Sequence, residues 1–337
     1  MHVFELSKRL IGMESITGNE REVSDFLFDM LGDLARRLDG RAERMEVEAG
    51  RQNVFVSFGD PRVVLSTHMD TVPPFIPARE DAEYIWGRGA CDAKGIIAAM
   101  IGAAEELLAT GRRDFGLLFV VGEERNSAGA LRAAHLSRGS QFLINGEPTE
   151  NRLALGSKGT LRYEIAAHGR MAHSAYPELG ESAIEKLLNA LERIRRVSLP
   201  SDSLFGPSTL NIGTIEGGRA PNVIPDEARA EILIRVVDDA AELRRSIESA
   251  VRPDAEAKEV LFIPPVRLGS VDGFATTVVA FTTDIPAFAG AWGKPFLLGP
   301  GSIHVAHTAE ERISKKDLLE AVGLYRMLVE RLLTEPV

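Results

Sequence analysis

Along residues 1 to about 155, short apolar runs of strand length alternate with longer amphipathic runs of helix length. This alternation constrains the fold most, because strands separated by helices build βαβ units and a largely parallel sheet. A first long helix is predicted at residues 17–38, because Thr17 and Glu20 have capping-box spacing and apolar residues then recur at helical intervals. Continuous apolar runs, typical of strands covered on both faces, lie at residues 53–58, 62–67, 117–121 and 142–144.

The middle of the chain has a different order of elements: strand, helix, strand, strand, helix, strand. This order is typical of a ferredoxin-like α+β module. After it, a helix at residues 273–284, a strand at 295–298 and a closing helix at 314–333 continue the first pattern. The predicted fold class is α/β, a mostly parallel sheet with helices on both faces, interrupted by an inserted α+β domain. The predicted domains are residues 1–157 with 268–337, and the insert, residues 158–267.

The charge balance argues against a polyanionic partner. The chain has 39 Lys and Arg against 49 Asp and Glu, a net charge of −10, and no basic cluster, so nucleic acid and anionic membranes would be repelled. Cys91 is the single cysteine, which excludes an intramolecular disulfide and fits a reducing compartment. The first ten residues contain acids and lack the apolar run of a signal peptide, so we expect a cytoplasmic protein.

Ionisable residues follow the predicted strands where each strand ends. They are His68 and Asp70 after the second strand, Glu123 and Glu124 after the third, Glu147 after the fourth and His307 beyond residues 295–298. Asp92 lies in the loop before another predicted helix. In an open parallel sheet the carboxyl ends of the strands face the crevice where ligands bind. We therefore expect these side chains to converge.

The converging residues suit a catalytic metal site. Five candidate ligands, two imidazoles and three carboxylates with no thiol, favour zinc, cobalt or manganese in an open site. Asp92 is the carboxylate best placed to bridge two ions, because it is central in the set. Two ions about 3.5–4 Å apart can activate a water molecule and polarise an amide carbonyl together.

Each of these residues also has an ordinary structural explanation. The adjacent glutamates could be a solvated pair, and Asp92 could cap the helix that follows it. His304 is the main alternative to His307, whereas His135 is assigned to a helix as a structural residue. Chance would rarely place such residues at the same edge in five separate loops, so the set as a whole favours the metal site.

Six motifs form a pattern that is recognisable as a whole. They are STHMDTVP at residues 66–73, GRGACDAKG at 87–95, GEE at 122–124, GEPT at 146–149, GGRAPNVIP at 217–225 and AHTAEE at 306–311. With them, essentially the whole chain resembles the zinc-dependent deacylase and exopeptidase family that contains acetylornithine deacetylase, succinyl-diaminopimelate desuccinylase, aminoacylase and carboxypeptidase G. The resemblance implies a zinc-exopeptidase-like fold in which the inserted domain closes as a lid and forms a homodimer.

The resemblance also implies the ligands of two divalent metal ions, zinc first and cobalt as an alternative. By it, His68, Asp92 and Glu147 hold one ion, and Asp92, Glu124 and His307 hold the other. A cis peptide bond after Asp92 is implied as well.

Further roles follow from the same resemblance. Glu123 would be the general base that takes a proton from the attacking water and returns it to the leaving amine. Asp70 would fix the tautomer of the neighbouring histidine ligand. His173 would reach the partner subunit's site and stabilise the oxyanion, and Asn222 and Arg235 would bind the substrate carboxylate.

The chain departs from the family pattern at three positions. Leu233 stands where the family usually has Asp, two residues before Arg235, which weakens the assignment of that arginine. Ala93 stands where Met is common, and Ser302 where some relatives have Asp. None of these departures touches a predicted metal ligand.

The predicted function is dinuclear metal-dependent removal of an acetyl or similar acyl group from the amino nitrogen of an amino acid such as ornithine or lysine. Glu147 favours it, because relatives that cleave dipeptides tend to carry Asp there. This substrate class would place the enzyme in arginine or lysine biosynthesis. The alternatives left open are a metal dipeptidase or carboxypeptidase, a succinyl-diaminopimelate desuccinylase, a hydrolase of carrier-bound lysine or ornithine, and an inactive binding homologue.

Overall fold

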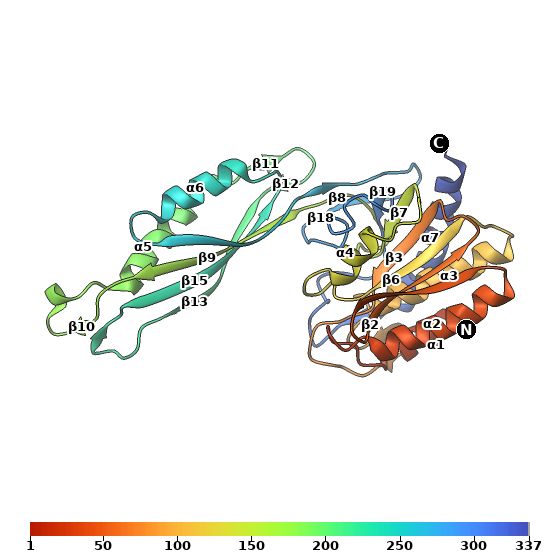
Figure 1. The fold of residues 1–337 in the computed structure, drawn as a ribbon, viewed down its shortest axis with the longest axis horizontal. Helices are drawn as coiled ribbons and strands as arrows, with labels where there is room; N and C mark the ends of the chain where they lie inside the picture. Colours follow the sequence, from red (N-terminus) through yellow and green to blue (C-terminus); the bar gives the residue numbers. More distant parts are fainter. Residues whose placement is uncertain (336–337) are drawn as a thin grey trace. The chain divides into compact units, whose positions relative to one another are not determined.

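The computed structural model describes residues 1–335, in which the chain divides into two units (Figure 1). Unit 1 consists of Met1–Leu155, Leu268–Thr277 and the chain from Thr283 onward. Unit 2 consists of Gly156–Arg267 and Val278–Thr282. Each unit has its own apolar core. No helix within the described chain is long and apolar enough to cross a membrane.

A six-stranded sheet with the order β1-β2-β6-β3-β7-β19 is the centre of unit 1. Its strands are β1 (Arg41–Glu48), β2 (Arg51–Phe58), β3 (Val63–His68), β6 (Phe115–Val120), β7 (Phe142–Asn145) and β19 (Lys294–Leu297). β6, β3, β7 and β19 pair in parallel, whereas β1 and β2 add an antiparallel edge. The predicted mostly parallel sheet is therefore confirmed.

Helices cover both faces of this sheet, as the continuous apolar strands require. One face packs against α1 (Val3–Ile11), α2 (Arg21–Arg37), α3 (Lys94–Ala109) and α7 (Lys315–Thr334). The other packs against α4 (Ala128–Ala134) and the segment that carries Trp292. Strand β2 shows the alternation, because Val54 and Val56 belong to the first cluster and Phe55 to the second.

The strand register brings the ends of the parallel strands to one edge. His68, the last residue of β3, lies opposite Val120 of β6, and Ser66 lies opposite Asn145 of β7. Asn145 in turn lies opposite Leu297 of β19. The loops after these strands therefore start side by side, and they carry Asp70, Glu123, Glu124, Glu147 and His307, whereas Asp92 lies in the loop before α3.

Unit 2 is an antiparallel sheet with the order β13-β15-β9-β16 and two helices. Its elements are β9 (Gly159–His168), α5 (Ala183–Arg195), β13 (Thr209–Gly217), β15 (Glu227–Val236), α6 (Ala241–Val251) and β16 (Glu256–Ile263). Every second residue of β15 faces the core, which gives the strand one apolar side. This is the predicted ferredoxin-like order, and Figure 1 shows β9, β15 and β13 running side by side.

Short elements complete the chain. They are β4 (Arg79–Glu80), β5 (Tyr84–Trp86), β8 (Leu153–Ser157), β10 (Ala172–His173), the 3₁₀ helix η1 (Pro177–Leu179), β11 (Ser201–Asp202), β12 (Gly206–Pro207), β14 (Val223–Ile224), β17 (Val266–Arg267), β18 (Thr276–Val279) and β20 (Arg312–Ser314).

Two predicted helices differ from the structure. The first begins at Arg21 rather than Thr17, because the Thr17 hydroxyl donates to Asp70 Oδ2 at 2.7 Å and the Glu20 carboxylate binds Arg51. The prediction of a capping box at Thr17 and Glu20 is therefore wrong. The predicted helix at residues 273–284 is also wrong: it contains strand β18, whose Thr-Thr-Val-Val sequence is β-branched throughout and favours extended backbone.

Candidate metal centre

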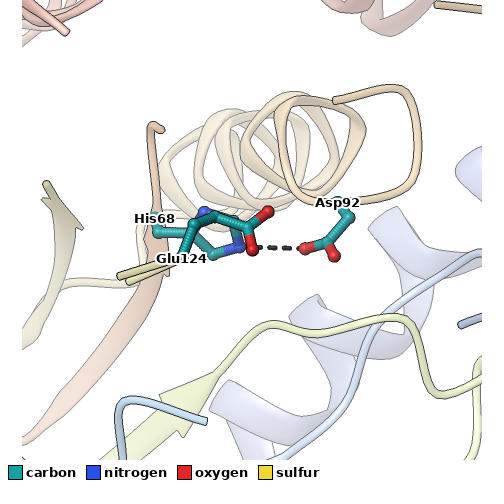
Figure 2. Close-up of side chains that lie close together, drawn as sticks. All are labelled: His68, Asp92 and Glu124. Carbon is teal, nitrogen blue, oxygen red and sulfur yellow. Dashed lines mark hydrogen bonds and ion pairs between the residues drawn. The ribbon is translucent and has the colours of Figure 1, made fainter. Parts of the chain in front are cut away.

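Three predicted ligands from three separate segments meet at the edge of the unit 1 sheet (Figure 2). His68 ends β3, Asp92 lies in the loop before α3, and Glu124 follows β6. Their ligand atoms all lie within 4.8 Å of one another, and His68 Nε2 is 2.9 Å from Asp92 Oδ1. In Figure 2 the three side chains point toward one another, which is the arrangement that a shared cation requires.

His307 and Glu147 lie around this group. His307 Nε2 is 3.3 Å from Asp92 Oδ2 and 3.1 Å from a carboxylate oxygen of Glu124, so Asp92 lies between two imidazoles. Glu147 is buried and close enough to His68 and Asp92 for their charges to affect its pKa. His304, the alternative to His307, is exposed, as His307 itself is, so the contacts with Asp92 and Glu124 and not burial favour His307.

Burial and mutual repulsion disfavour the charged form of the glutamates around this site. Burial, and then the charge of Glu147, raise the pKa of Glu123 well above its usual range. Burial also raises the pKa of Glu147, although the nearby His68 opposes the shift. Hydrogen bonds to Asp92 and Glu124 raise the pKa of His307 to about 10. Gathered carboxylates of this kind need cations, so the donor set fits two divalent ions that share Asp92.

Asp70 fixes the loop that carries the two glutamates. Its carboxylate accepts the backbone N–H groups of Gly122 at 2.9 Å, Glu123 at 3.1 Å and Glu124 at 3.2 Å. His68 Nδ1 is 3.5 Å from this carboxylate and 3.0 Å from the Asp70 backbone oxygen, so the carbonyl is its nearer partner. Asp70 thus contacts both the predicted ligand His68 and the backbone of the predicted base Glu123.

The peptide bond between Asp92 and Ala93 is cis. The prediction of a cis bond after Asp92 is therefore confirmed.

Unit 2 carries the other predicted residues. His173 and Asn222 are neighbours, because β10 pairs with β14 and the Ser174 N–H donates to the Asn222 carbonyl at 3.0 Å. The Ala175 N–H donates to His173 Nδ1 at 3.1 Å, which leaves the ring proton on Nε2. Arg235 on β15 is half-buried and donates to the Thr160 hydroxyl at 2.7 Å.

Sequence reasoning missed several buried charged residues near the ligand loops. Arg88 and Glu311 pair with an Nη1–Oε2 distance of 2.6 Å, and both lie inside motifs quoted for the resemblance but had no role assigned. Asp284 is buried, and burial raises its pKa to about 7. Asp284 lies at the end of a segment predicted to be a helix. No sequence pattern therefore indicated that it lies near the glutamates.

Residues 64–331 match the peptidase family M20/M25/M40. The chain belongs to this family. Its members are metal-dependent hydrolases, so the predictions of a metal-dependent enzyme and of a zinc-exopeptidase-like fold are confirmed.

Relatives in the M20 family refine this assignment. A peptidase M20 domain-containing protein of Schizosaccharomyces pombe is 41% identical, covering 97% of this chain and 84% of its own. A probable carboxypeptidase of Aspergillus flavus is 38% identical, covering 95% of this chain and 85% of its own. These similarities support the carboxypeptidase alternative better than the predicted deacylase.

Solved structures show the same fold at low identity. Aminopeptidase PepT from Bacillus cereus has a TM-score of 0.81 at 19% identity, covering 99% of this chain and 98% of its own. A dinuclear metal binding M20 peptidase from Bacillus subtilis has a TM-score of 0.69 at 17% identity, covering 99% and 98%.

Proposed function

We propose that the chain is a metallo-carboxypeptidase, which hydrolyses the amide bond joining a C-terminal amino acid to a small peptide. The observation that carries the proposal is the group of His68, Asp92 and Glu124, of which the first two are buried, in a chain similar over nearly its whole length to probable carboxypeptidases. Zinc is the proposed metal, because imidazole and carboxylate are the donors and thiolate is absent from the group.

The second candidate is removal of an acyl group from an amino acid such as ornithine or lysine, as the sequence first suggested. Both reactions release an amino acid that has a free carboxylate. They differ only in the group attached to the carbonyl of the amide that is cleaved. Glu147 supports both candidates over a dipeptidase, because the family resemblance associates Asp with dipeptide cleavage at this position.

Glu123 is proposed as the general base. Two divalent ions held by His68, Asp92, Glu147, Glu124 and His307 would supply Lewis-acid polarisation of the scissile carbonyl and of the attacking water. The Glu123 carboxylate would accept a proton from that water and deliver it to the leaving nitrogen. Its backbone N–H is held by Asp70, so the base is fixed beside the ligand that follows it in sequence.

Residues of unit 2 are proposed to bind the substrate. Arg235 would pair with the substrate carboxylate, since its observed side-chain partner is a neutral hydroxyl. His173 would donate its Nε2 proton to the oxyanion, which fits the tautomer set by the Ala175 N–H. Asn222, beside His173, would add a neutral donor.

We also propose a homodimer formed through unit 2. Strand β13 lies at the edge of its sheet and is largely exposed, so its free backbone groups can pair with a second copy. Sedimentation analysis should give twice the chain mass, whereas a single-chain mass at working concentration would contradict the dimer. The cytoplasmic location stays a prediction.

A matched substrate panel tests the activity. Zinc-loaded protein is incubated with N-blocked dipeptides, with the same peptides amidated at the C-terminus, with N-acetyl amino acids and with free dipeptides, each with and without chelator. We expect chelator-sensitive release of the C-terminal amino acid from the blocked peptides and little from the amidated ones. Turnover of N-acetyl amino acids alone would support the deacylase instead. Turnover of free dipeptides alone would support a dipeptidase.

A further inference from the structure

A buried carboxylate lies behind the loop that carries Asp92. Glu311 is 1% exposed, and its Oε1 accepts the backbone N–H groups of Gly89 at 2.9 Å, Cys91 at 3.3 Å and Asp92 at 3.3 Å. One oxygen atom therefore holds three amides of a single turn. The last of these amides belongs to the residue proposed to bridge the two ions.

Arg88 completes this arrangement from the other end of the loop. It is 2% exposed, and its Nη1 donates to Glu311 Oε2 at 2.6 Å and to the Thr308 carbonyl at 3.2 Å. Its Nε donates to the Pro74 carbonyl at 3.3 Å. Thr308 directly follows His307, so the guanidinium joins the loop of Asp92 to the loop of a second proposed ligand.

Stability alone is a weak reason for such a pair. Removing two charges from water is costly, and buried ion pairs can often be replaced by apolar side chains without loss of stability. What apolar side chains lack is an acceptor for the three amides and a donor for the two carbonyls. The hydrogen bonds of Glu311 and Arg88 therefore fix the backbone of the two loops that carry Asp92 and His307.

We propose that Glu311 and Arg88 are positioning residues that hold Asp92 and His307 in the geometry required to bind metal. The proposal rests on the metal-dependent hydrolysis proposed above, but it does not depend on which substrate is cleaved. Neither residue is assigned a contact with the ions or with the substrate. Their effect on turnover is exerted through Asp92 and His307.

Zinc affinity and folding, measured separately on the same variants, test this proposal. The variants are Glu311→Gln, the double variant Arg88→Met with Glu311→Met, and the control Glu43→Gln, which removes a partly exposed ion pair of β1. Melting temperature is measured on the metal-free proteins, and zinc affinity by competition with a chromophoric chelator. The visible spectrum of the cobalt-loaded protein reports the ligand geometry.

We expect Glu311→Gln to weaken zinc binding by about 10–100-fold, the usual effect of disturbing a residue that orients a ligand, because the single amide oxygen can accept from the loop N–H groups or from Arg88 but not from both. The double variant removes both buried charges but leaves the loop amides and carbonyls without side-chain partners, so its melting temperature should lie above that of Glu311→Gln and below that of the wild type, while zinc binding stays weak and the cobalt spectrum stays altered. Glu43→Gln should bind zinc as the wild type does.

Zinc affinity that recovers together with the melting temperature in the double variant would overturn the proposal, because the pair would then be merely structural. Wild-type affinity in Glu311→Gln would overturn it as well. If Glu311→Gln does not fold, the double variant decides by the same criterion, with Arg88→Lys as a second single variant.

Wild-type protein that binds zinc but cleaves no substrate of the panel would refute the proposed function and leave this inference standing. Wild-type protein that binds no zinc would refute both.

Discussion

The two units differ in where they bury charge. Within residues 1–335, every buried Asp, Glu, His, Lys or Arg side chain belongs to unit 1: Glu20, His68, Asp70, Arg88, Asp92, Lys94, Glu147, Asp284 and Glu311. The buried core of unit 2 is apolar, and its ion pairs, such as Arg229 with Glu216, lie at the surface.

This contrast supports unit 1 as the part that holds the proposed metal site. Each buried charge costs several kcal/mol of desolvation, so a cluster of them persists where a cation or a reaction uses it. Unit 2 needs no such explanation for its stability, because burial of alternate apolar residues is sufficient. Its proposed functional residues, His173, Asn222 and Arg235, are exposed or half-buried and so remain available to a ligand.

The largest effect should come from the base in unit 1. We expect Glu123→Gln to lower turnover by about 10²–10⁴-fold, because the amide keeps the shape of the side chain but accepts no proton. Metal content, measured by elemental analysis, should stay unchanged, and the exposed Glu320→Gln should behave as the wild type. Loss of metal in Glu123→Gln would move this residue into the ligand set.

A smaller effect is expected from the surface of unit 2. His173→Ala should lower turnover by about 10²–10³-fold, the typical value of one oxyanion donor, without loss of metal. His168→Ala, which removes another exposed histidine of the same unit, is the control.

Mixing decides whether His173 serves the neighbouring subunit. When His173→Ala and Glu123→Gln proteins exchange subunits, a trans-acting histidine gives the mixed dimer one complete site, and activity returns. If exchange is proven and no activity returns, the trans-acting role is wrong.

Arg235 should affect binding more than chemistry. Arg235→Met should raise KM by about 10–100-fold for substrates with a free carboxylate, since a charge-assisted hydrogen bond of about 1.5–3 kcal/mol is lost. Arg229→Met, an exposed arginine on the same strand, is the control. An equal loss with amidated substrates would show that Arg235 does not bind the carboxylate.

The sequence predicted that the candidate ligands gather at one edge of the sheet better than it predicted some of the elements around them. Polar residues at strand ends identified the positions of His68, Glu124 and Glu147, because apolar runs define buried strands and the carboxyl ends of parallel strands share an edge. β1 was missed, because an edge strand with the sequence RAERMEVE buries only Met45 and has no apolar run. The proposed role of Glu311 and Arg88 depends on contacts between residues 219 to 223 positions apart, which local patterns do not contain.

The smallest effect should come from a surface ion pair of unit 2. Hydrogen bonding to Arg244 lowers the pKa of Glu259, so the ionised pair stabilises the fold above pH about 4.5 and loses this effect as pH falls through the lowered pKa. Glu259→Gln should therefore cost at most about 1 kcal/mol of unfolding free energy at pH 7, and less in acid. Denaturant titrations at both pH values measure it. A difference that grows toward acid pH would contradict this assignment.

The central claim is that unit 1 holds two metal ions that share Asp92. Anomalous diffraction from crystals of zinc-loaded protein, collected at the zinc edge, tests it most directly. We predict two peaks per chain beside Asp92, one bound by His68 and Glu147 and the other by Glu124 and His307. Zinc-loaded crystals with no peak at Asp92, or with His304 in the place of His307, would contradict the account.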